Sequence, residues 1–475
     1  MINPQKKHIN YLPHISSILF TIGLIIVPNF LFWGISLKFH VARPIFNLDY
    51  FIAGALFATR FKPIAYLFFA TALSFDFLAI GGLIFPFVRI QDINYLLSML
   101  PYAALIWQLS AVVILFTIIG FVYLFFKFSH KIKPVVALAA LLLSFTVYQA
   151  YALQPSFREA DAFYSTSNKI IDSQGYFFIS THLISFIDNF YAPADPLFQV
   201  GFKGQTHNWV ETSPNSLNKK LLLIIAESWG VMKDSQIQKA MIAPLLNQSN
   251  QFDWLEQGTL ASRFSTVRAE LQELCGLDTH HYNLKPLIQG FKDCLPWKLA
   301  NHGYQTISIH GSTGLMYDRL YWYPRAGFEK SHFKETNDWQ TQCYSFPGIC
   351  DREIISNYLS HVFEDNKKRF VYYLTLNTHP LYDLRDLHKD IFNCAVYKIP
   401  EKSETCRMVK LHTQFFDDLA QILDKDTMAG VEVIIIGDHQ PRIFDSKEFQ
   451  KYLEDDRVSW MHFRIKDQSK DKFQI

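Results

Sequence analysis

The chain has 475 residues, more than one typical domain holds, and its formal net charge at pH 7 is only +2. It contains no long run of Lys and Arg and no nucleic-acid-binding motif, so we exclude DNA and RNA as partners. Hydrophobic residues make up 49% of the sequence, but they are concentrated in the first third, whereas the remainder has the charges and turns of a globular domain.

The first third predicts a membrane domain over residues 1–153. A helix needs about 20 apolar residues to cross the hydrocarbon core of a bilayer. Five stretches are predicted to span the membrane: 15–37, 45–59, 62–87, 103–126 and 134–153. The second is short, with Asp49 and Arg60 near its ends. A cleavable signal peptide is disfavoured, because further apolar stretches follow the first one without a small-residue cleavage pattern.

The Lys and Arg residues of the short loops predict the orientation of these spans. With the N-terminus inside, the inside segments hold seven of these residues and the outside loops hold three. An odd number of spans then places everything after residue 153 outside the cytoplasm. Asp76 lies inside the third span, where it either lines a lipid or acceptor path or, as is more common, bonds a neighbouring helix.

All six cysteines lie after the membrane domain. An even number of cysteines confined to one domain fits disulfide bonds in an oxidising compartment, which agrees with the predicted orientation. The spacing suggests pairs such as Cys343 with Cys350 and Cys394 with Cys406, but it does not determine the connectivity. Six free buried thiols are the alternative, and a zinc cluster is disfavoured because no CxxC spacing occurs.

Residues 154–218 are predicted to form a juxtamembrane connector. Within it, residues 176–191 have apolar side chains at helical spacing and few charges. This segment is either an interfacial helix that holds the next domain near the lipid surface or a helix packed on the globular domain. The polar run that follows, up to residue 218, reads as a loop or linker.

Residues 219–475 predict an α/β domain with a mainly parallel sheet. Four short apolar runs look like buried strands: 221–226, 305–309, 371–376 and 431–436. Helical patterns separate them, around 287–302, 352–366 and 407–424. This alternation is typical of a parallel sheet between helices. Ligands of such sheets bind beyond the carboxyl ends of the strands.

Each predicted strand is followed by polar groups at that end. Glu227 follows the first strand, His310 the second, His379 lies just past the third, and Asp438 and His439 follow the fourth. For any one of them, a capping or loop-bonding role would be favoured. Their convergence at one edge instead predicts a site for one divalent metal, and carboxylate and imidazole ligands suit Zn²⁺ or Mn²⁺.

Thr266 lies in the segment FSTVRAELQELCGL. A Thr hydroxyl is a weak nucleophile, but coordination to a metal lowers its pKa and enables attack on phosphorus. From composition alone Thr266 does not stand out from Ser265, and an ordinary helix N-cap is the alternative interpretation.

The order of five segments carries a resemblance to a known family: IAES, STVRAELQELCG, HGSTGLMYDR, LNTHP and GDHQP. It resembles the alkaline-phosphatase-like sulfatase superfamily and, within it, the lipoteichoic acid synthase and phosphoglycerol transferase branch. The resemblance covers roughly residues 219–445, and the predicted layout of the membrane part also matches that branch. It implies an α-helical transmembrane bundle followed by an α/β alkaline-phosphatase-like (sulfatase) domain with a mainly parallel sheet.

The resemblance also implies roles for the matching residues. Glu227, Asp438 and His439 match metal ligands, and Thr266 matches the nucleophile, which also binds the metal. A second set surrounds the substrate. His379 matches a His that approaches the transferred group or the leaving oxygen, His310 and Arg319 match a pair that grips the substrate phosphate, and Tyr317 stands where the branch has a large aromatic residue.

The sequence departs from the family pattern at three places. Ser312 stands where the branch can have an acidic residue, which weakens any inference about the acceptor. The nucleophile segment lacks the Cys or Ser followed by Pro-x-Arg from which sulfatases make formylglycine, so hydrolysis of sulfate esters is disfavoured. The final motif reads GDHQP and not the GDHGE of lipid A phosphoethanolamine transferases.

The resemblance implies metal-dependent transfer of a phospholipid head group, preferably phosphoglycerol, to a cell-envelope glycan through a phosphothreonine intermediate. The partners would be a phospholipid donor, a glycan acceptor and the membrane, and no protein partner can be inferred. The expected location is the bacterial inner membrane, multi-pass, with a periplasmic catalytic domain. The alternatives are a phosphoethanolamine transferase acting on lipopolysaccharide or capsule, a membrane-bound phosphodiesterase that uses water, and a degenerate lipid-binding protein.

Overall fold

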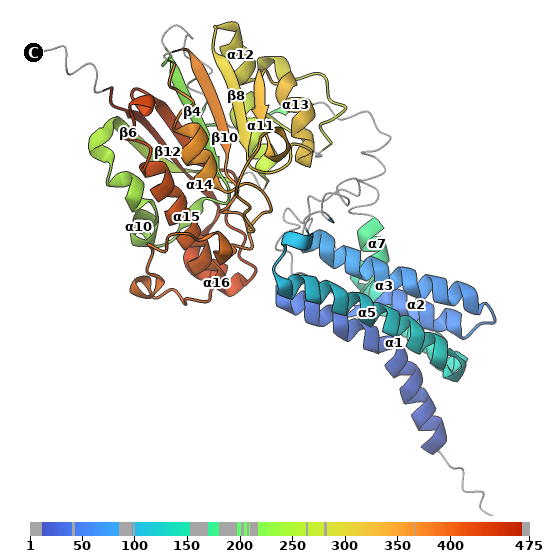
Figure 1. The fold of residues 1–475 in the computed structure, drawn as a ribbon. Coiled ribbons are helices and arrows are strands. Elements are labelled where there is room, and N and C mark those ends of the chain that lie inside the picture. The colour runs from blue at the N-terminus through green and yellow to red at the C-terminus, as the bar shows by residue number, and fades with distance from the viewer. Residues whose placement is uncertain are drawn as a thin grey trace, which may run out of the picture. The chain divides into compact units, whose positions relative to one another are not determined.

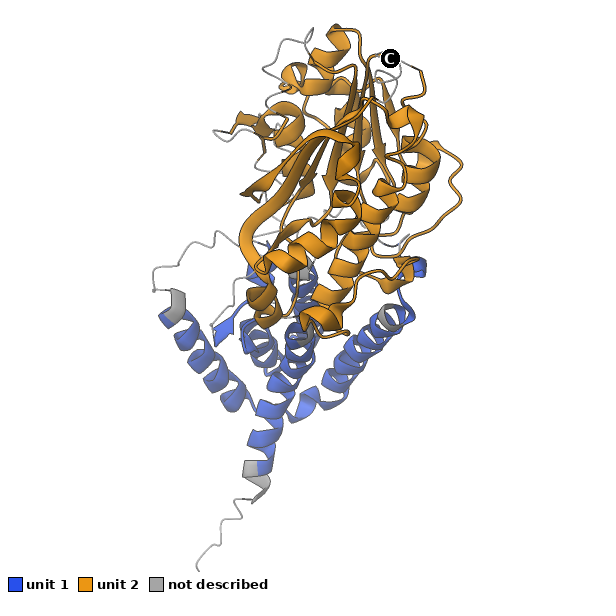
Figure 2. Ribbon diagram, turned by 90° about the vertical axis from the view of Figure 1, so that its left-hand side faces the viewer, with its two compact units in different colours: residues 1–190 blue, residues 191–475 orange. Residues whose placement is uncertain are grey.

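The chain forms two compact units, Met1–Phe190 and Tyr191–Ile475 (Figure 2). The computed structural model describes residues 12–39, 43–84, 97, 100–152, 170–179, 197–200, 204–206, 209, 217–262, 265–279, 283–365 and 367–467. The described residues of the predicted connector divide between the two units, because residues 170–179 belong to the first and those from 197 onward to the second.

Apolar helices make up the first unit (Figure 1). They are α1 (Leu12–Phe39), α2 (Leu48–Phe57), α3 (Lys62–Ile84), α5 (Leu105–Phe128) and α6 (Pro134–Ala152). A helix thus occupies each predicted position, and three contain a stretch long and apolar enough to cross a membrane: Ser16–Leu37, Lys62–Gly81 and Gln108–Lys131. Helix α2 has 10 residues, and a helix of that length rises only about 15 Å. Five spans therefore stay a prediction.

A buried ion pair holds polar groups together inside this unit. Arg43 Nη2 lies 2.6 Å from Asp76 Oδ2, and both side chains are fully buried. The Tyr50 hydroxyl also donates to Asp76, at 2.8 Å. Asp76 therefore bonds neighbouring segments, the more common of the two interpretations of a carboxyl group in a predicted span.

The chain packs against the first unit again after α6. Strand β2 (Ile171–Asp172) pairs in parallel with β1 (Phe46–Asn47), and α7 (Gln174–Phe178) follows it. The Gly175 N–H donates to Asp49 at 2.8 Å. Helix α7 covers only the first residues of the predicted helix 176–191, and the part of that helix after residue 179 lies outside the described residues.

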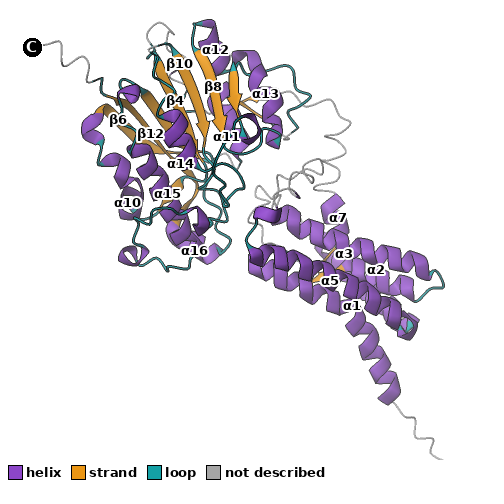
Figure 3. Ribbon diagram, viewed as in Figure 1, coloured by secondary structure: helices purple, strands orange, loops and turns teal. Residues whose placement is uncertain are grey.

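The second unit is built on a mixed sheet, whose described part has eight strands in the order β5-β12-β11-β4-β10-β8-β9, with β6 paired to β12 (Figure 3). The parallel strands are β4 (Lys220–Ala226), β8 (Gln305–His310), β9 (Lys330–His332), β10 (Arg369–Leu374) and β11 (Glu432–Gly437). The antiparallel strands are β5 (Gly230–Met232), β6 (Phe252–Ala261) and β12 (Leu453–Ile465). The predicted mainly parallel sheet is confirmed, with an antiparallel extension on one side.

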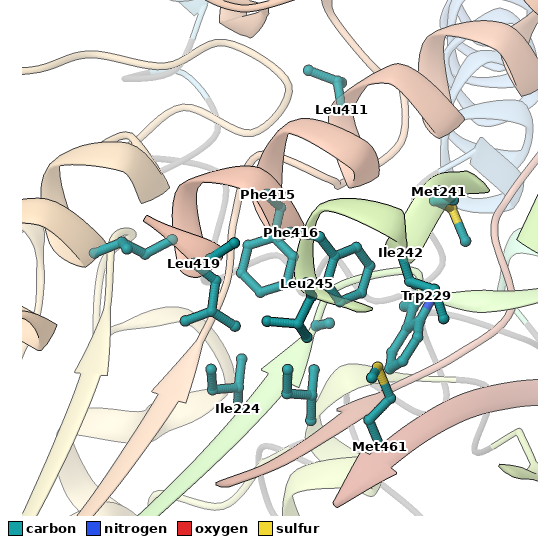
Figure 4. Close-up of a cluster of buried hydrophobic side chains, with 14 of the residues drawn as sticks. Ile224, Trp229, Met241, Ile242, Leu245, Leu411, Phe415, Phe416, Leu419 and Met461 are labelled. Carbon is teal, nitrogen blue, oxygen red and sulfur yellow. The ribbon is translucent and has the colours of Figure 1, made fainter. Parts of the chain in front are cut away.

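Helices cover both faces of this sheet, which is why its central strands are apolar along their whole length. Helices α10 (Ser235–Leu246), α14 (Asp351–Ile354) and α15 (Glu404–Ala420) lie in front of the sheet in Figure 1. Ile224 of β4 faces the core formed with Leu245, Phe416 and Leu419 (Figure 4). The next residue, Ile225, lies on the opposite face beside Ala269 of α11 (Thr266–Cys275).

Two predicted helices differ from the observed ones. The pattern over 287–302 becomes a short 3₁₀-helix, Phe291–Asp293, and an α-helix only at α12 (Leu295–Asn301), because Gly290 has a positive φ of 98° and Pro296 favours the first turn of a helix. The pattern over 352–366 becomes the short α14 followed by a π-helix, Ile355–Leu359.

Three disulfides confirm the expectation drawn from the cysteine count. They are Cys275–Cys294, Cys343–Cys350 and Cys394–Cys406, so both pairs that the spacing suggested are present.

Candidate active site

The predicted site residues gather at the carboxyl ends of the parallel strands. Glu227 directly follows β4, His310 is the last residue of β8, and Asp438 and His439 directly follow β11. His379 lies in the turn that follows β10. Because parallel strands end at the same edge of a sheet, residues far apart in sequence meet there.

Glu227, Asp438 and His439 form a group that could hold a metal ion. One ligand atom from each lies within 4.8 Å of the other two. His439 Nε2 is 3.1 Å from Glu227 Oε1 and 3.5 Å from Asp438 Oδ2. His439 Nδ1 lies 2.9 Å from the carbonyl oxygen of Gln440, which only accepts, so the neutral ring carries its proton on Nδ1 and directs the Nε2 lone pair toward the carboxylates.

The hydrogen bonds of Asp438 show that a cation fits this group. Its Oδ1 accepts from the backbone N–H groups of Ser228, at 2.8 Å, and of His439, at 2.7 Å. Its Oδ2 is buried and has no hydrogen-bond partner. A buried carboxylate oxygen without a donor costs free energy, which a bound cation removes. Two carboxylates and one imidazole suit Zn²⁺ or Mn²⁺ and do not choose between them.

The charges of these three groups are strongly coupled. Burial, with the neighbouring Glu227 carboxylate, raises the pKa of Asp438 to about 7. Burial lowers the pKa of His439, but the Asp438 and Glu227 carboxylates outweigh it and raise that pKa to about 10. Burial also opposes ionisation of Glu227, yet the nearby His379 and His439 hold its pKa below the usual range. Without a metal, the imidazole would be the main positive charge beside the two carboxyl groups.

Thr266 lies beside this group at the start of α11. Its hydroxyl oxygen is 3.4 Å from Glu227 Oε2, and the residue is 8% exposed. The N-cap position belongs to Ser265, so the interpretation of Thr266 as an ordinary N-cap is wrong. The amino end of a helix carries partial positive charge, so the position of Thr266 suits attack on an anionic phosphate.

Two histidines flank the group, and burial lowers the pKa of each. His379 Nδ1 lies 2.5 Å from the carbonyl oxygen of Pro380, and burial lowers the pKa of His379 while Glu227 opposes that shift. His310 Nδ1 lies 3.2 Å from the carbonyl oxygen of Leu374. Burial, with the adjacent Arg319 charge, lowers the pKa of His310 to about 3. His310 therefore offers a lone pair on Nε2 at pH 7 and no positive charge.

Arg319 begins α13 (Arg319–Arg325), and its charge acts on His310. The guanidinium lies over the ring of Tyr317, with 5.1 Å between Cζ and the ring centroid. Its Nη2 forms an ion pair with Glu270 Oε2 at 2.8 Å, and both side chains are buried. All the residues predicted for the site thus lie in one connected region, and their roles stay predictions.

Two carboxylates that organise this region were not predicted from the sequence. Glu270 holds Arg319, and the only hint was its position four residues after Thr266, on the same side of a helix. Asp351 accepts from the backbone N–H groups of Leu376, at 3.0 Å, and Asn377, at 2.7 Å, and so shapes the turn that carries His379. No pattern in the sequence pointed to Asp351.

Comparisons with known proteins agree with this architecture. The family model described as Sulfatase matches residues 219–471, just over half of the chain. No curated protein sequence matches the chain significantly.

Several solved structures are similar at low identity. The lipoteichoic acid synthase LtaP from Listeria monocytogenes has 17% identity and a TM-score of 0.40, with 52% of this chain and 65% of that chain covered. The phosphoglycerol transferase GacH from Streptococcus pyogenes, in complex with sn-glycerol-1-phosphate, has 13% identity and a TM-score of 0.38, covering 57% and 78%. The C-terminal periplasmic domain of EcEptC from Escherichia coli has 13% identity and a TM-score of 0.38, covering 59% and 79%. These similarities assign no residue role in this chain.

Proposed function

The chain belongs to the sulfatase family, and from that premise we propose that it transfers a phospholipid head group, preferably phosphoglycerol, to a glycan of the cell envelope through a phosphothreonine intermediate. The proposal includes the location, with the apolar helices in the inner membrane of a bacterium and the catalytic unit in the periplasm. Three disulfides support an oxidising compartment.

One observation carries the proposal: the hydroxyl of Thr266 lies 3.4 Å from Glu227 Oε2, within a group of ligands that fits a divalent metal. A hydroxyl in that position is a nucleophile and not a sulfatase formylglycine. The apolar helices of the same chain would keep this nucleophile at a lipid surface, where phospholipids are the abundant phosphodiesters.

Glu227, Asp438 and His439 would hold one divalent metal, Zn²⁺ or Mn²⁺, which when bound lowers the pKa of a nearby hydroxyl and neutralises phosphate charge. In the first half-reaction the Thr266 proton is lost to solvent and its oxygen forms a bond to phosphorus. The bond from phosphorus to the diacylglycerol oxygen breaks, and His379 takes up a proton from solvent on Nε2 and passes it to that oxygen.

In the second half-reaction the roles reverse. The hydroxyl of the glycan acceptor gives its proton to His379 and forms a bond to phosphorus, and the bond to Thr266 breaks. Thr266 then regains a proton from solvent, and His379 returns the acceptor's proton to solvent. Arg319, together with the amino end of α11, stabilises negative charge on the non-bridging oxygens. Positioning and charge neutralisation are the main tasks of a protein in phosphoryl transfer, and these residues suit both.

The test uses the purified full-length protein with Mn²⁺ or Zn²⁺ and two donors in separate reactions. One is phosphatidylglycerol labelled in its terminal glycerol, the other phosphatidylethanolamine labelled in ethanolamine. We expect release of diacylglycerol and a label on Thr266, identified by mass spectrometry of peptides. Phosphatidylglycerol should be the better donor, and the reverse would make phosphoethanolamine the transferred group.

A labelled glycan acceptor decides between transfer and hydrolysis. Adding an envelope glycan fraction should move the label from Thr266 to sugar. Release of glycerol phosphate at an unchanged rate, with none on the glycan, would identify a phosphodiesterase. A wild-type protein that releases no diacylglycerol from either lipid would refute the proposed function.

A further inference from the structure

Four fully buried polar side chains meet behind the nucleophile helix. Glu270 lies on α11, Arg319 and Tyr323 on α13, and Tyr372 in the middle of β10. None of them is more than 2% exposed. Burying a carboxylate, a guanidinium and two hydroxyls costs a large desolvation free energy, which a protein bears only where the hydrogen bonds are well formed.

The carboxylate of Glu270 is the centre of this tetrad. Its Oε1 accepts from the hydroxyl of Tyr372 at 2.9 Å and from the hydroxyl of Tyr323. Its Oε2 accepts from Arg319 Nη2 at 2.8 Å and from Arg319 Nε at 3.1 Å. The two tyrosines thus fix the carboxylate from one side, and the carboxylate fixes the guanidinium from the other.

These bonds use only one side of the Arg319 fork. Nη1 takes no part in these bonds and forms no hydrogen bond with any described residue. Two N–H groups on Nη1 therefore remain for a ligand. A guanidinium whose opposite edge is fixed presents these donors in one orientation, which suits the oxygens of a phosphate.

The tetrad also ties the guanidinium to the nucleophile. Glu270 follows Thr266 by four residues on α11, and residues so spaced lie on the same side of a helix. A shift of α11 would therefore move Thr266 and the anchor of Arg319 together. The spacing between the attacking oxygen and the phosphate donors is thereby held by a single rigid element.

We propose that Glu270 is a positioning residue of the active site, which Tyr323 and Tyr372 hold in place so that Arg319 presents Nη1 to the phosphate of the substrate. The inference rests on the proposed function only in taking that phosphate to be a phospholipid head group. It makes the tetrad part of the phosphate site and not only a support of the fold.

The test measures the affinity of the full-length, metal-loaded protein for inorganic phosphate by isothermal titration calorimetry, which needs no turnover. Tyr372→Phe and Tyr323→Phe each remove one donor to Glu270 and leave the ion pair intact. Tyr304→Phe is the matched control. Tyr304 is buried just before the amino end of β8, at the opposite end of that strand from the site, and its hydroxyl donates at 2.8 Å to the carbonyl oxygen of Asn218. Glu270→Gln is the stronger variant, and its folding is checked by circular dichroism.

We expect Tyr372→Phe and Tyr323→Phe to weaken phosphate binding about three- to tenfold, the size of one lost hydrogen bond. Tyr304→Phe should bind as the wild type does, with a comparable change in Tm. Arg319→Lys should weaken binding, and adding Tyr372→Phe to it should have no further effect, because the tyrosine acts through the guanidinium.

Wild-type affinity in both tyrosine variants would overturn the proposal. An equal loss from Tyr372→Phe in the wild-type and Arg319→Lys backgrounds would also overturn it, as would a wild-type protein that binds no phosphate. Phosphate binding that responds as expected, in a protein that releases no diacylglycerol, would leave the role of Glu270 standing and refute the lipid donor alone.

Discussion

Replacing Thr266 with Ala should abolish transfer while leaving the fold almost unchanged. The Thr266 hydroxyl lies 3.4 Å from Glu227 Oε2, which is longer than a good O–H···O hydrogen bond, and it also interacts with the Asp438 carboxylate, so its loss costs about 1 kcal/mol. Loss of the partly buried methyl group costs about 0.8 kcal/mol, and the higher helix propensity of Ala returns about 0.5 kcal/mol. The net destabilisation is about 1 kcal/mol, or about 2 °C in Tm.

The effect on the reaction should be far larger. Removal of a covalent nucleophile lowers the rate on the order of 10⁴-fold or more, because the residues that remain cannot form the intermediate. The assay is diacylglycerol release from labelled phospholipid, with Tm measured on the same samples. Thr306→Ala is the matched control. Thr306 is buried at the amino end of β8, away from the site, and its hydroxyl donates at 2.7 Å to the carbonyl oxygen of Gly327.

Thr306→Ala should lose at least as much stability as Thr266→Ala and keep its activity. Residual transfer above about 1% of wild type in Thr266→Ala would show that another group attacks phosphorus. A loss of activity in both variants would show that the effect comes from the fold. Either result would refute the assignment of Thr266.

Three further predictions follow from the buried charges. Chelation should abolish transfer and lower Tm, because metal at about 1,000 times its Kd stabilises a folded protein by about 4 kcal/mol. Asp438→Asn should remove the metal-dependent shift in Tm. The same shift in that variant would contradict the proposed set of metal ligands. Burial raises the pKa of Asp351 from 3.8 to about 6. The protonated carboxyl group therefore contributes its full stabilisation below pH 3.8, and this contribution to the free energy of unfolding, about 3 kcal/mol, is lost as pH rises through about 6. Urea unfolding between pH 4 and 7 should show this dependence in the wild type and not in Asp351→Asn, and equal slopes would refute it. Asp76→Ala should destabilise the first unit by about 3–5 kcal/mol, because it leaves the buried Arg43 charge unpaired. The double variant Arg43→Met with Asp76→Leu should recover most of the folded fraction in detergent, and no recovery would mean that the pair does more than compensate charge.

Four of the five described parallel strands and their polar edge could be predicted for a local reason, whereas the three-residue β9 was too short to show a pattern. Strands buried on both faces read as short apolar runs, and here each run is followed within a few residues by Glu, His or Asp. A polar residue that directly follows an apolar run is therefore expected at the carboxyl edge of the sheet. The antiparallel extension was missed because the exposed residues of β12 form one charged run, 455–457, which resembles a turn, and only the later residues alternate between buried and partly exposed.

The two glutamates of α11 show why the rest of the site could not be predicted. Glu270 and Glu273 are three residues apart and both are buried, yet their partners differ completely. Glu270 holds Arg319, whereas Glu273 accepts from the backbone N–H groups of Gln205, at 3.2 Å, and Thr206, at 3.1 Å. Their partners come from elsewhere in the chain, so the sequence of the helix does not distinguish the two roles.

Three contacts fix α11, the helix that carries the proposed nucleophile. Glu270 ties α11 to Arg319, Glu273 ties it to the segment that precedes the catalytic sheet, and Cys275 ties its last residue to Cys294 at the start of α12. A weak nucleophile such as Thr depends on being held at the right distance from phosphorus, and misplacement by about 1 Å can cost on the order of 100-fold in rate. In the proposed phosphoryl transfer the protein would mostly position groups and stabilise charge, so the tertiary contacts of α11 would contribute to the reaction as much as the Thr266 hydroxyl does.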